Sequence, residues 1–248
     1  MVSLQIQMIG TGSAFSKKYY NNNALVYSNG FKLLVDCGST APRALHELKV
    51  PMDDIDGILI THIHADHVGG LEEFAFRFKY TYQKQIKLFV PAPLLDSLWN
   101  HSLRGGLENP SEGLHGLNDY FQVIALRDTT PIQLFPGLRV QLIATVHIPG
   151  KPSFALLFND KVFYSSDTVF DYSLLVRLYE TRQCEYFLHD CQLTSPGLVH
   201  ASLDDLLTLP ESVQQQLLLM HYDDTKDSYM GRTGNMNFIE QHRLYDFP

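Results

Sequence analysis

The chain has 248 residues, of which 45% are hydrophobic and 19% are charged, and its formal net charge is −8. This length is enough for a sizeable core, and we predict a single domain over residues 1–248. The net negative charge and the lack of clustered Lys and Arg argue against binding of a large nucleic acid, because binding a polyanion needs concentrated positive charge.

The sequence gives little indication of membrane insertion, export or disulfide bonds. No run approaches the roughly 20 apolar residues that span a bilayer, and the first ten residues lack the charged and apolar regions of a signal peptide. Three cysteines, Cys37, Cys184 and Cys191, are an odd number without C-x-x-C spacing, which argues against a disulfide framework and a thiolate metal site. We therefore expect a cytoplasmic protein without membrane contact.

The first half of the chain predicts strands that alternate with a few helices. Short apolar runs bounded by glycine-containing turns indicate strands at residues 4–9, 24–27, 31–35, 57–60 and 86–90. Helices are expected at residues 42–48, 68–80 and 94–99, and a polar stretch at residues 101–118 reads as a loop.

The second half repeats this pattern. Strands are expected at residues 121–126, 132–135, 138–145, 154–158, 162–165, 186–188 and 217–220, and helices at 172–179, 202–207 and 211–216. Strand-rich halves that each end in helices predict an α/β (α+β) fold with two sheets packed face to face and helices outside.

One short segment carries the strongest chemical signal. Residues 61–70 read Thr-His-Ile-His-Ala-Asp-His-Val-Gly-Gly, directly after the apolar run at 57–60. His62 and His64 point to one side of the strand end and can bind one ion, whereas Asp66 and His67 fall at the following turn and can face a second. Neutral imidazole and carboxylate suit Zn²⁺ or a similar divalent metal, and paired ions activate water for hydrolysis. The alternative is that these histidines are merely exposed on the surface. Four potential ligands at this spacing argue against it.

Three further residues each follow a predicted apolar strand. They are His147, Asp167 and His221. A single residue of this kind is often only a helix cap or an exposed group. Three such residues at the ends of separate strands are expected to converge on one edge with the histidine-rich segment at residues 61–70, called the cassette below.

These residues, with Gly-Thr-Gly-Ser at Gly10 and Asp-Cys-Gly at Asp36, resemble the metallo-β-lactamase fold over nearly the whole chain. The resemblance implies an αβ/βα sandwich of two mixed sheets flanked by helices. It also implies that His62, His64 and His147 hold one ion, that Asp66, His67 and His221 hold the other, and that Asp167 bridges them. The nucleophile would be water activated between the ions, with Asp66 also in the catalytic set and Asp36 orienting a ligating imidazole.

The segments Phe-Leu-His-Asp at residues 187–190 and His-Ala-Ser at 200–202 resemble the ribonuclease Z branch. That likeness implies that Asp190 supports His200, which protonates the leaving oxygen of a phosphodiester. The alternative is that His200 merely flanks a helix N-terminus. Ribonuclease Z carries a long arm between the positions matching His147 and Asp167, and this chain has only a Pro-Gly-Lys-Pro turn and two strands there.

The short, arm-less chain and its Tyr-Tyr-Asn-Asn-Asn segment at residues 19–23 look most like the phage-encoded anti-Pycsar proteins. This implies a homodimer in which residues 101–118 lie over a neighbouring site, and a small cyclic-nucleotide substrate. We predict a phosphodiesterase with two divalent ions, Zn²⁺ first and Mn²⁺ second, which hydrolyses 3′,5′-cyclic nucleotides to linear monophosphates and so evades cyclic-nucleotide immune signalling. The alternatives are a ribonuclease Z-like tRNA 3′-processing nuclease, an ester, lactone or thioester hydrolase, and a non-catalytic nucleotide-binding protein.

Overall fold

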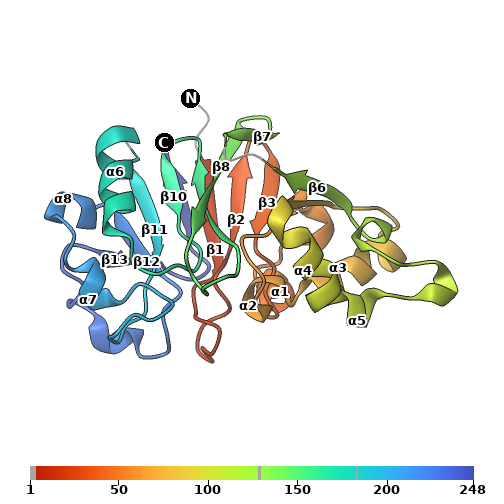
Figure 1. Ribbon diagram of the computed structural model, residues 1–248, viewed down its shortest axis with the longest axis horizontal. Coiled ribbons are helices and arrows are strands. Elements are labelled where there is room, and N and C mark those ends of the chain that lie inside the picture. The colour runs from red at the N-terminus through yellow and green to blue at the C-terminus, as the bar shows by residue number, and fades with distance from the viewer. Residues whose placement is uncertain (1–3, 128–129, 183) are drawn as a thin grey trace.

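The computed structural model describes residues 4–127, 130–182 and 184–248, and two seven-stranded sheets form its centre (Figure 1). The first sheet has the order β14 (Leu244–Phe247), β1 (Leu4–Gly10), β2 (Asn23–Ser28), β3 (Phe31–Val35), β4 (Gly57–Leu59), β5 (Lys87–Pro91) and β6 (Gln122–Leu126). The second has the order β13 (Asn237–Phe238), β12 (Leu217–Met220), β11 (Tyr186–Asp190), β10 (Val162–Tyr164), β9 (Ser153–Phe158), β8 (Leu138–Thr145) and β7 (Ile132–Phe135).

Both sheets are mixed in the same way. Strands β3 to β6 are parallel to one another, and β14, β1, β2 and β3 are joined by antiparallel pairings. In the second sheet β10 to β13 are parallel, and β7 to β10 are joined by antiparallel pairings. These two mixed sheets confirm the predicted fold class.

Helices cover the outer face of each sheet (Figure 1). Outside the first sheet lie α1 (Ala41–Glu47), α2 (Ala65–Val68), α3 (Leu71–Phe76), α4 (Leu95–Leu98) and α5 (Arg104–Leu107). Outside the second lie α6 (Tyr172–Arg182), α7 (Leu203–Leu206) and α8 (Glu211–Gln214). Short 3₁₀ and π turns complete the helical segments: η1 (Met52–Asp54), η2 (Arg77–Thr81), η3 (Ala92–Leu94), η4 (Trp99–Leu103), η5 (Pro110–Glu112), η6 (Leu117–Asp119) and η7 (Lys226–Tyr229).

Strand β9 shows why the sandwich forms. All six of its residues are buried. Leu156 and Phe158 belong to the cluster shared with the first sheet, whereas Ala155 and Leu157 pack in the cluster that contains α6 and its Leu175. Because successive strand residues point to opposite faces, an uninterrupted apolar strand must be covered on both sides.

The structure corrects several predicted boundaries. The stretch 101–118 is largely helical, because Leu103 and Leu107 lie four residues apart and are buried in the core. The helix expected at 68–80 is interrupted at Gly69 and Gly70, where a Cβ on Gly70 would lie 2.5 Å from the carbonyl oxygen of Gly38. The short strands β13 and β14 were not predicted.

No helix in the described part of the chain is long and apolar enough to cross a membrane. The sheet edges are more informative. Strands β3 and β4 run parallel in one sheet, and β10, β11 and β12 run parallel in the other. Strand β8 runs in the same direction as β10, because both are antiparallel to β9. The carboxyl ends of these strands therefore gather polar side chains at one edge of the sandwich.

Candidate metal centre

The predicted ligands meet at this edge in two overlapping clusters of donor atoms, and the ligand atoms of each lie within 4.8 Å of one another. The first consists of His62, His64, His147 and Asp167, and the second of Asp66, His67, His221 and Asp167. Asp167 is the residue shared between them. The two clusters are compatible with a dimetal site.

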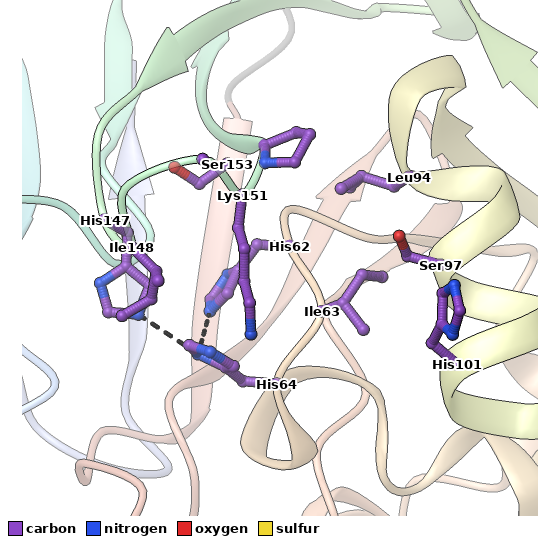
Figure 2. Close-up of a pocket in the computed structure, with 12 residues that line it drawn as sticks. His62, Ile63, His64, Leu94, Ser97, His101, His147, Ile148, Lys151 and Ser153 are labelled. Carbon is purple, nitrogen blue, oxygen red and sulfur yellow. Dashed lines mark hydrogen bonds between the residues drawn. The ribbon is translucent and has the colours of Figure 1, made fainter.

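In the first cluster, His64 Nδ1 lies 3.2 Å from both His62 Nε2 and His147 Nε2 (Figure 2). Asp167 Oδ2 lies 3.7 Å from His62 Nε2 and 3.8 Å from His147 Nε2. Ligands placed tetrahedrally at zinc bond lengths are about 3.3 Å apart, so four donors at these separations suit one ion.

In the second cluster, His67 Nε2 lies 3.2 Å from Asp66 Oδ2 and 3.3 Å from Asp167 Oδ1. His221 Nε2 lies 3.5 Å from Asp66 Oδ2 and 3.3 Å from Asp167 Oδ2. The oxygens of Asp167 thus face both clusters, as a bridging carboxylate does.

A group of buried polar atoms supports the fit to metal ions. Four donor atoms of the second cluster are buried without a hydrogen-bond partner among the described residues: Asp66 Oδ2, His67 Nε2, Asp167 Oδ1 and His221 Nε2. Such atoms are rare in proteins because each loses its hydration without compensation. A divalent ion held by this cluster would satisfy them, so the donor set fits a metal cofactor.

The other ring nitrogens of three imidazoles are already engaged. His67 Nδ1 donates to Asp36 Oδ2 at 2.7 Å, and His147 Nδ1 donates to the carbonyl oxygen of Val199 at 2.7 Å. His221 Nδ1 lies 3.2 Å from Asp190 Oδ1. These contacts fix the rings and leave each Nε2 facing a cluster, which is how ligating histidines are usually held.

The electrostatics differ between the clusters. Burial lowers the pKa of His62, His64 and His147, which favours the neutral ring that a metal needs. Burial also disfavours a charged His67, but Asp167, Asp66 and Asp36 outweigh it and raise the pKa of His67 well above its usual value. A divalent cation would supply the positive charge that these carboxylates attract.

The predicted Asp190–His200 pair lies beside both clusters. His200 Nδ1 lies 2.7 Å from Asp190 Oδ2, and the His200 ring is 4.8 Å from that of His147 and 4.7 Å from that of His221. Asp190 is fully buried, whereas the His200 side chain is 20% exposed. Burial alone would lower the pKa of His200, but the Asp190 carboxylate outweighs it and raises that pKa. Asp190 therefore orients the His200 ring and favours its charged form.

Three residues of this edge have left-handed backbone. Asp36, Ser166 and His221 have φ values of 58°, 51° and 61°, a region that non-glycine residues seldom adopt. Asp36 and His221 lie directly after a strand and Ser166 lies two residues after β10, and each is, or is adjacent to, a predicted site residue. Strain of this kind is typical of functional sites, where the surrounding structure compensates for it.

A cavity of about 390 Å³ opens next to the first cluster (Figure 2). His62, His64 and His147 line one side, and residues from the 148–153 turn and from the α4 region line the others. The α4 region contributes Leu94, Ser97 and His101, the turn contributes Ile148, Gly150, Lys151, Pro152 and Ser153, and Ile63 lies between the two histidines after β4. Figure 2 shows Lys151 extending into the cavity toward His64.

All nine predicted site residues therefore lie at one edge, and their roles as ligands and catalytic groups stay predictions. The sequence did not single out two further residues at this edge, Thr61 and Lys151, as functional candidates. Thr61 directly precedes the first histidine, but no spacing pattern distinguishes its hydroxyl from those of other threonines. Lys151 lies in the Pro-Gly-Lys-Pro turn, which was interpreted only as a short connection.

Solved structures share the fold at low sequence identity. The metallo-beta-lactamase fold protein YhfI from Bacillus subtilis has a TM-score of 0.76 at 16% identity, covering 99% of this chain and 100% of that one. Human tRNase Z, short form, has a TM-score of 0.67 at 17% identity, covering 98% and 99%. Zn²⁺-bound PqqB from Methylobacterium extorquens has a TM-score of 0.74 at 11% identity, covering 98% and 100%. The fold is that of the metallo-β-lactamases, as predicted.

Closer relatives identify the family. A protein of Paenibacillus xerothermodurans described as anti-Pycsar protein Apyc1 is 62% identical over 246 residues, 99% of this chain and 98% of its own. A protein of Bacillus phage vB_BveM-Goe7 with the same description is 47% identical over 253 residues, 96% of each chain. The sequence model described as anti-Pycsar protein Apyc1 matches residues 4–245. With both the site geometry and this match along nearly its whole length, the chain belongs to the anti-Pycsar protein Apyc1 family.

Proposed function

We propose that the protein is a dimetal phosphodiesterase that hydrolyses the 3′,5′-cyclic phosphate of nucleotides to linear nucleoside monophosphates. The observation that carries this proposal is the buried Asp190 carboxylate holding a partly exposed His200 at 2.7 Å, beside two clusters of metal-binding residues. The family name gives independent support, because it points to cyclic-nucleotide immune signals as the target.

His62, His64 and His147 would hold one ion, and Asp66, His67 and His221 the other, with Asp167 between them. When bound, two divalent ions supply positive charge for the phosphate and lower the pKa of a water. We propose Zn²⁺ as the native metal and Mn²⁺ as the second choice. The imidazole-rich first cluster supports this preference, as does the Zn²⁺-bound state of the PqqB structure with the same fold.

His200 would act on the leaving oxygen. The ribose alkoxide is a poor leaving group, so a proton delivered at that atom lowers the barrier. His200 Nδ1 is engaged by Asp190, which leaves Nε2 to carry the transferable proton. The Asp190 carboxylate raises the pKa of His200, which favours the protonated ring that this role needs.

The cavity supports a small substrate. Its volume of about 390 Å³ falls in the range of pockets that enclose single small molecules. Leu94, Ile63 and Ile148 provide apolar walls for a base, and Lys151 provides a cation that can meet the phosphate. A long RNA would need an extended positive surface instead, and the chain carries a net charge of −8.

The test is a substrate panel with the metal-loaded protein. We expect linear monophosphates from cyclic AMP, GMP, CMP or UMP, and no turnover of precursor tRNA, lactones or thioesters. Cleavage of precursor tRNA alone would favour a processing nuclease, and turnover of the acyl substrates alone would favour an esterase. Stoichiometric binding of a cyclic nucleotide without turnover would favour a non-catalytic binder.

Two predictions about the biological setting belong to the same proposal. Relatives from phages support a role in removing cyclic-nucleotide signals in the cytoplasm of a bacterial host. We also propose a homodimer in which residues 101–118 reach toward the neighbouring site. Light scattering of the purified protein measures its oligomeric state.

A further inference from the structure

The hydroxyl of Thr61 occupies a position that neither the ligand set nor the proposed acid accounts for. Thr61 is fully buried after β4, immediately before the first histidine of the cassette. Its Oγ1 lies 2.7 Å from Asp36 Oδ2, 2.7 Å from Ser166 Oγ and 3.2 Å from His62 Nδ1. Its backbone N–H also donates to Asp36 Oδ1 at 2.8 Å.

Counting donors and acceptors fixes the direction of these bonds. A threonine hydroxyl has one proton to donate and accepts two hydrogen bonds. The carboxylate of Asp36 accepts only, so the single Thr61 proton goes to Asp36. The other two neighbours must then donate to Thr61 Oγ1: Ser166 through its hydroxyl and His62 through Nδ1–H. The His62 proton is thereby placed on Nδ1, and Nε2 is left with a lone pair facing the first cluster.

The same hydroxyl is connected to the second cluster. Asp36 Oδ2, which accepts from Thr61, also accepts from His67 Nδ1 at 2.7 Å, so His67 Nε2 is the nitrogen that faces the second cluster. Ser166 directly precedes Asp167, the shared carboxylate, and its left-handed backbone starts the turn that directs Asp167 toward both clusters. Thr61 thus contacts a support for each cluster and lies between the two sheets, since Ser166 follows β10 of the second sheet.

We propose that Thr61 is a positioning residue that sets the His62 tautomer and couples the two ion sites before any ion binds. This inference depends on one part of the proposed function, namely that the two clusters bind metal ions. It predicts that loss of the hydroxyl weakens binding at both sites, although Thr61 itself belongs to neither.

The decisive pair of variants is Thr61→Val, which keeps the shape and removes the hydroxyl, and Thr61→Ser, which keeps the hydroxyl. Zn²⁺ affinity is measured by competition with a chromophoric chelator. We expect Thr61→Val to bind both ions about 10- to 100-fold more weakly, as is usual when support of a ligating histidine is lost, and Thr61→Ser to stay within a few-fold of wild type. Thr81→Val, at an exposed threonine, is the matched control and is expected to bind as wild type does.

A second measurement does not depend on any variant folding. The ¹⁵N shifts of the His62 ring in the metal-free wild-type protein, at a pH where that ring is neutral, report which nitrogen carries the proton. We expect Nδ1–H. Nε2–H in the wild type, or wild-type affinity at both sites in Thr61→Val, overturns the inference. Wild-type protein that binds no metal ions would instead contradict the proposed function, so the two failures are distinguishable.

Discussion

At the scale of single residues, the site engages one ring nitrogen of several histidines and leaves the other nitrogen free. His67, His147 and His200 each engage Nδ1 with a carboxylate or a carbonyl oxygen, at 2.7 Å in all three cases. Their Nε2 atoms are left for an ion or a substrate. The accepting group is therefore as important to the chemistry as the ring itself, because it decides which nitrogen remains available.

Replacing His200 tests its role as the acid. We expect His200→Ala to lower kcat for a cyclic nucleotide by about 100- to 10,000-fold, with metal content unchanged. The loss should be small with bis(p-nitrophenyl) phosphate, because p-nitrophenolate leaves without a proton. Steady-state kinetics on both substrates make the comparison, with His46→Ala, at an exposed histidine of α1, as the control. Equal losses on the two substrates would contradict proton donation.

Replacing Lys151 tests whether the cavity binds the substrate phosphate. We expect Lys151→Met to raise KM for cyclic nucleotides about tenfold with little change in kcat, since one contact to a charged phosphate contributes about 1.5 kcal/mol. Lys49→Met, at an exposed lysine after α1, should leave both constants unchanged. An unchanged KM in Lys151→Met would remove the lysine from the proposed substrate contacts.

At the scale of elements, close backbone approaches hold the cassette in place. Cys37 N donates to the carbonyl oxygen of His67 at 2.7 Å, and Gly70 N donates to the carbonyl oxygen of Cys37 at 2.8 Å. The loop after β3 is thereby attached to α2 and the start of α3. Gly38 sits where a Cβ would lie 2.0 Å from the carbonyl oxygen of Asp66, so only glycine permits this packing.

Gly38→Ala should therefore disturb the second ion site. We expect a loss of about 1–3 kcal/mol in the free energy of unfolding, the usual cost of overpacking, and weaker Zn²⁺ binding because Asp66 is displaced. Gly105→Ala is the matched control, since no atom lies within 4 Å of its added Cβ, and in α5 it should gain up to about 1 kcal/mol. Urea unfolding and chelator competition measure the two quantities. Wild-type Zn²⁺ affinity in Gly38→Ala would show that this contact does not position Asp66.

At the scale of the whole molecule, the clusters lie at the seam between the sheets, and each contains groups from both. Asp66 and His67 come from the first sheet's side, and Asp167 and His221 from the second. Bound ions would therefore join the two halves. Without them, the buried carboxylates Asp66 and Asp167 face each other with only imidazoles between.

Removing the ions should lower stability as well as activity. At free Zn²⁺ about 100-fold above its Kd, binding adds about 2.7 kcal/mol per site, which for a chain of this size corresponds to roughly 5–10 °C in Tm. We expect dialysis against a chelator, which removes both ions, to lower Tm by about twice this amount, roughly 10–20 °C, and Zn²⁺ to restore it. A single transition before and after would agree with the proposed single domain over residues 1–248, whereas an unchanged Tm would contradict a metal bridge between the sheets.

The fold class, the family resemblance and the candidate ligands could be predicted from the sequence, because alternating apolar runs and the Thr-His-Ile-His-Ala-Asp-His segment are local patterns. The family resemblance predicted that His147 joins His64, 83 residues away, but nothing in the sequence predicted that Thr61 meets Ser166, 105 residues away. Both contacts form only where the ends of β4, β8 and β10 meet at one edge of the sandwich. The broken cassette helix and the helical stretch at 101–118 were also decided by tertiary packing, through the Gly70–Gly38 contact and the burial of Leu103 and Leu107. Local patterns specify which side chains are present, and only the packing of the two sheets specifies which atoms face one another.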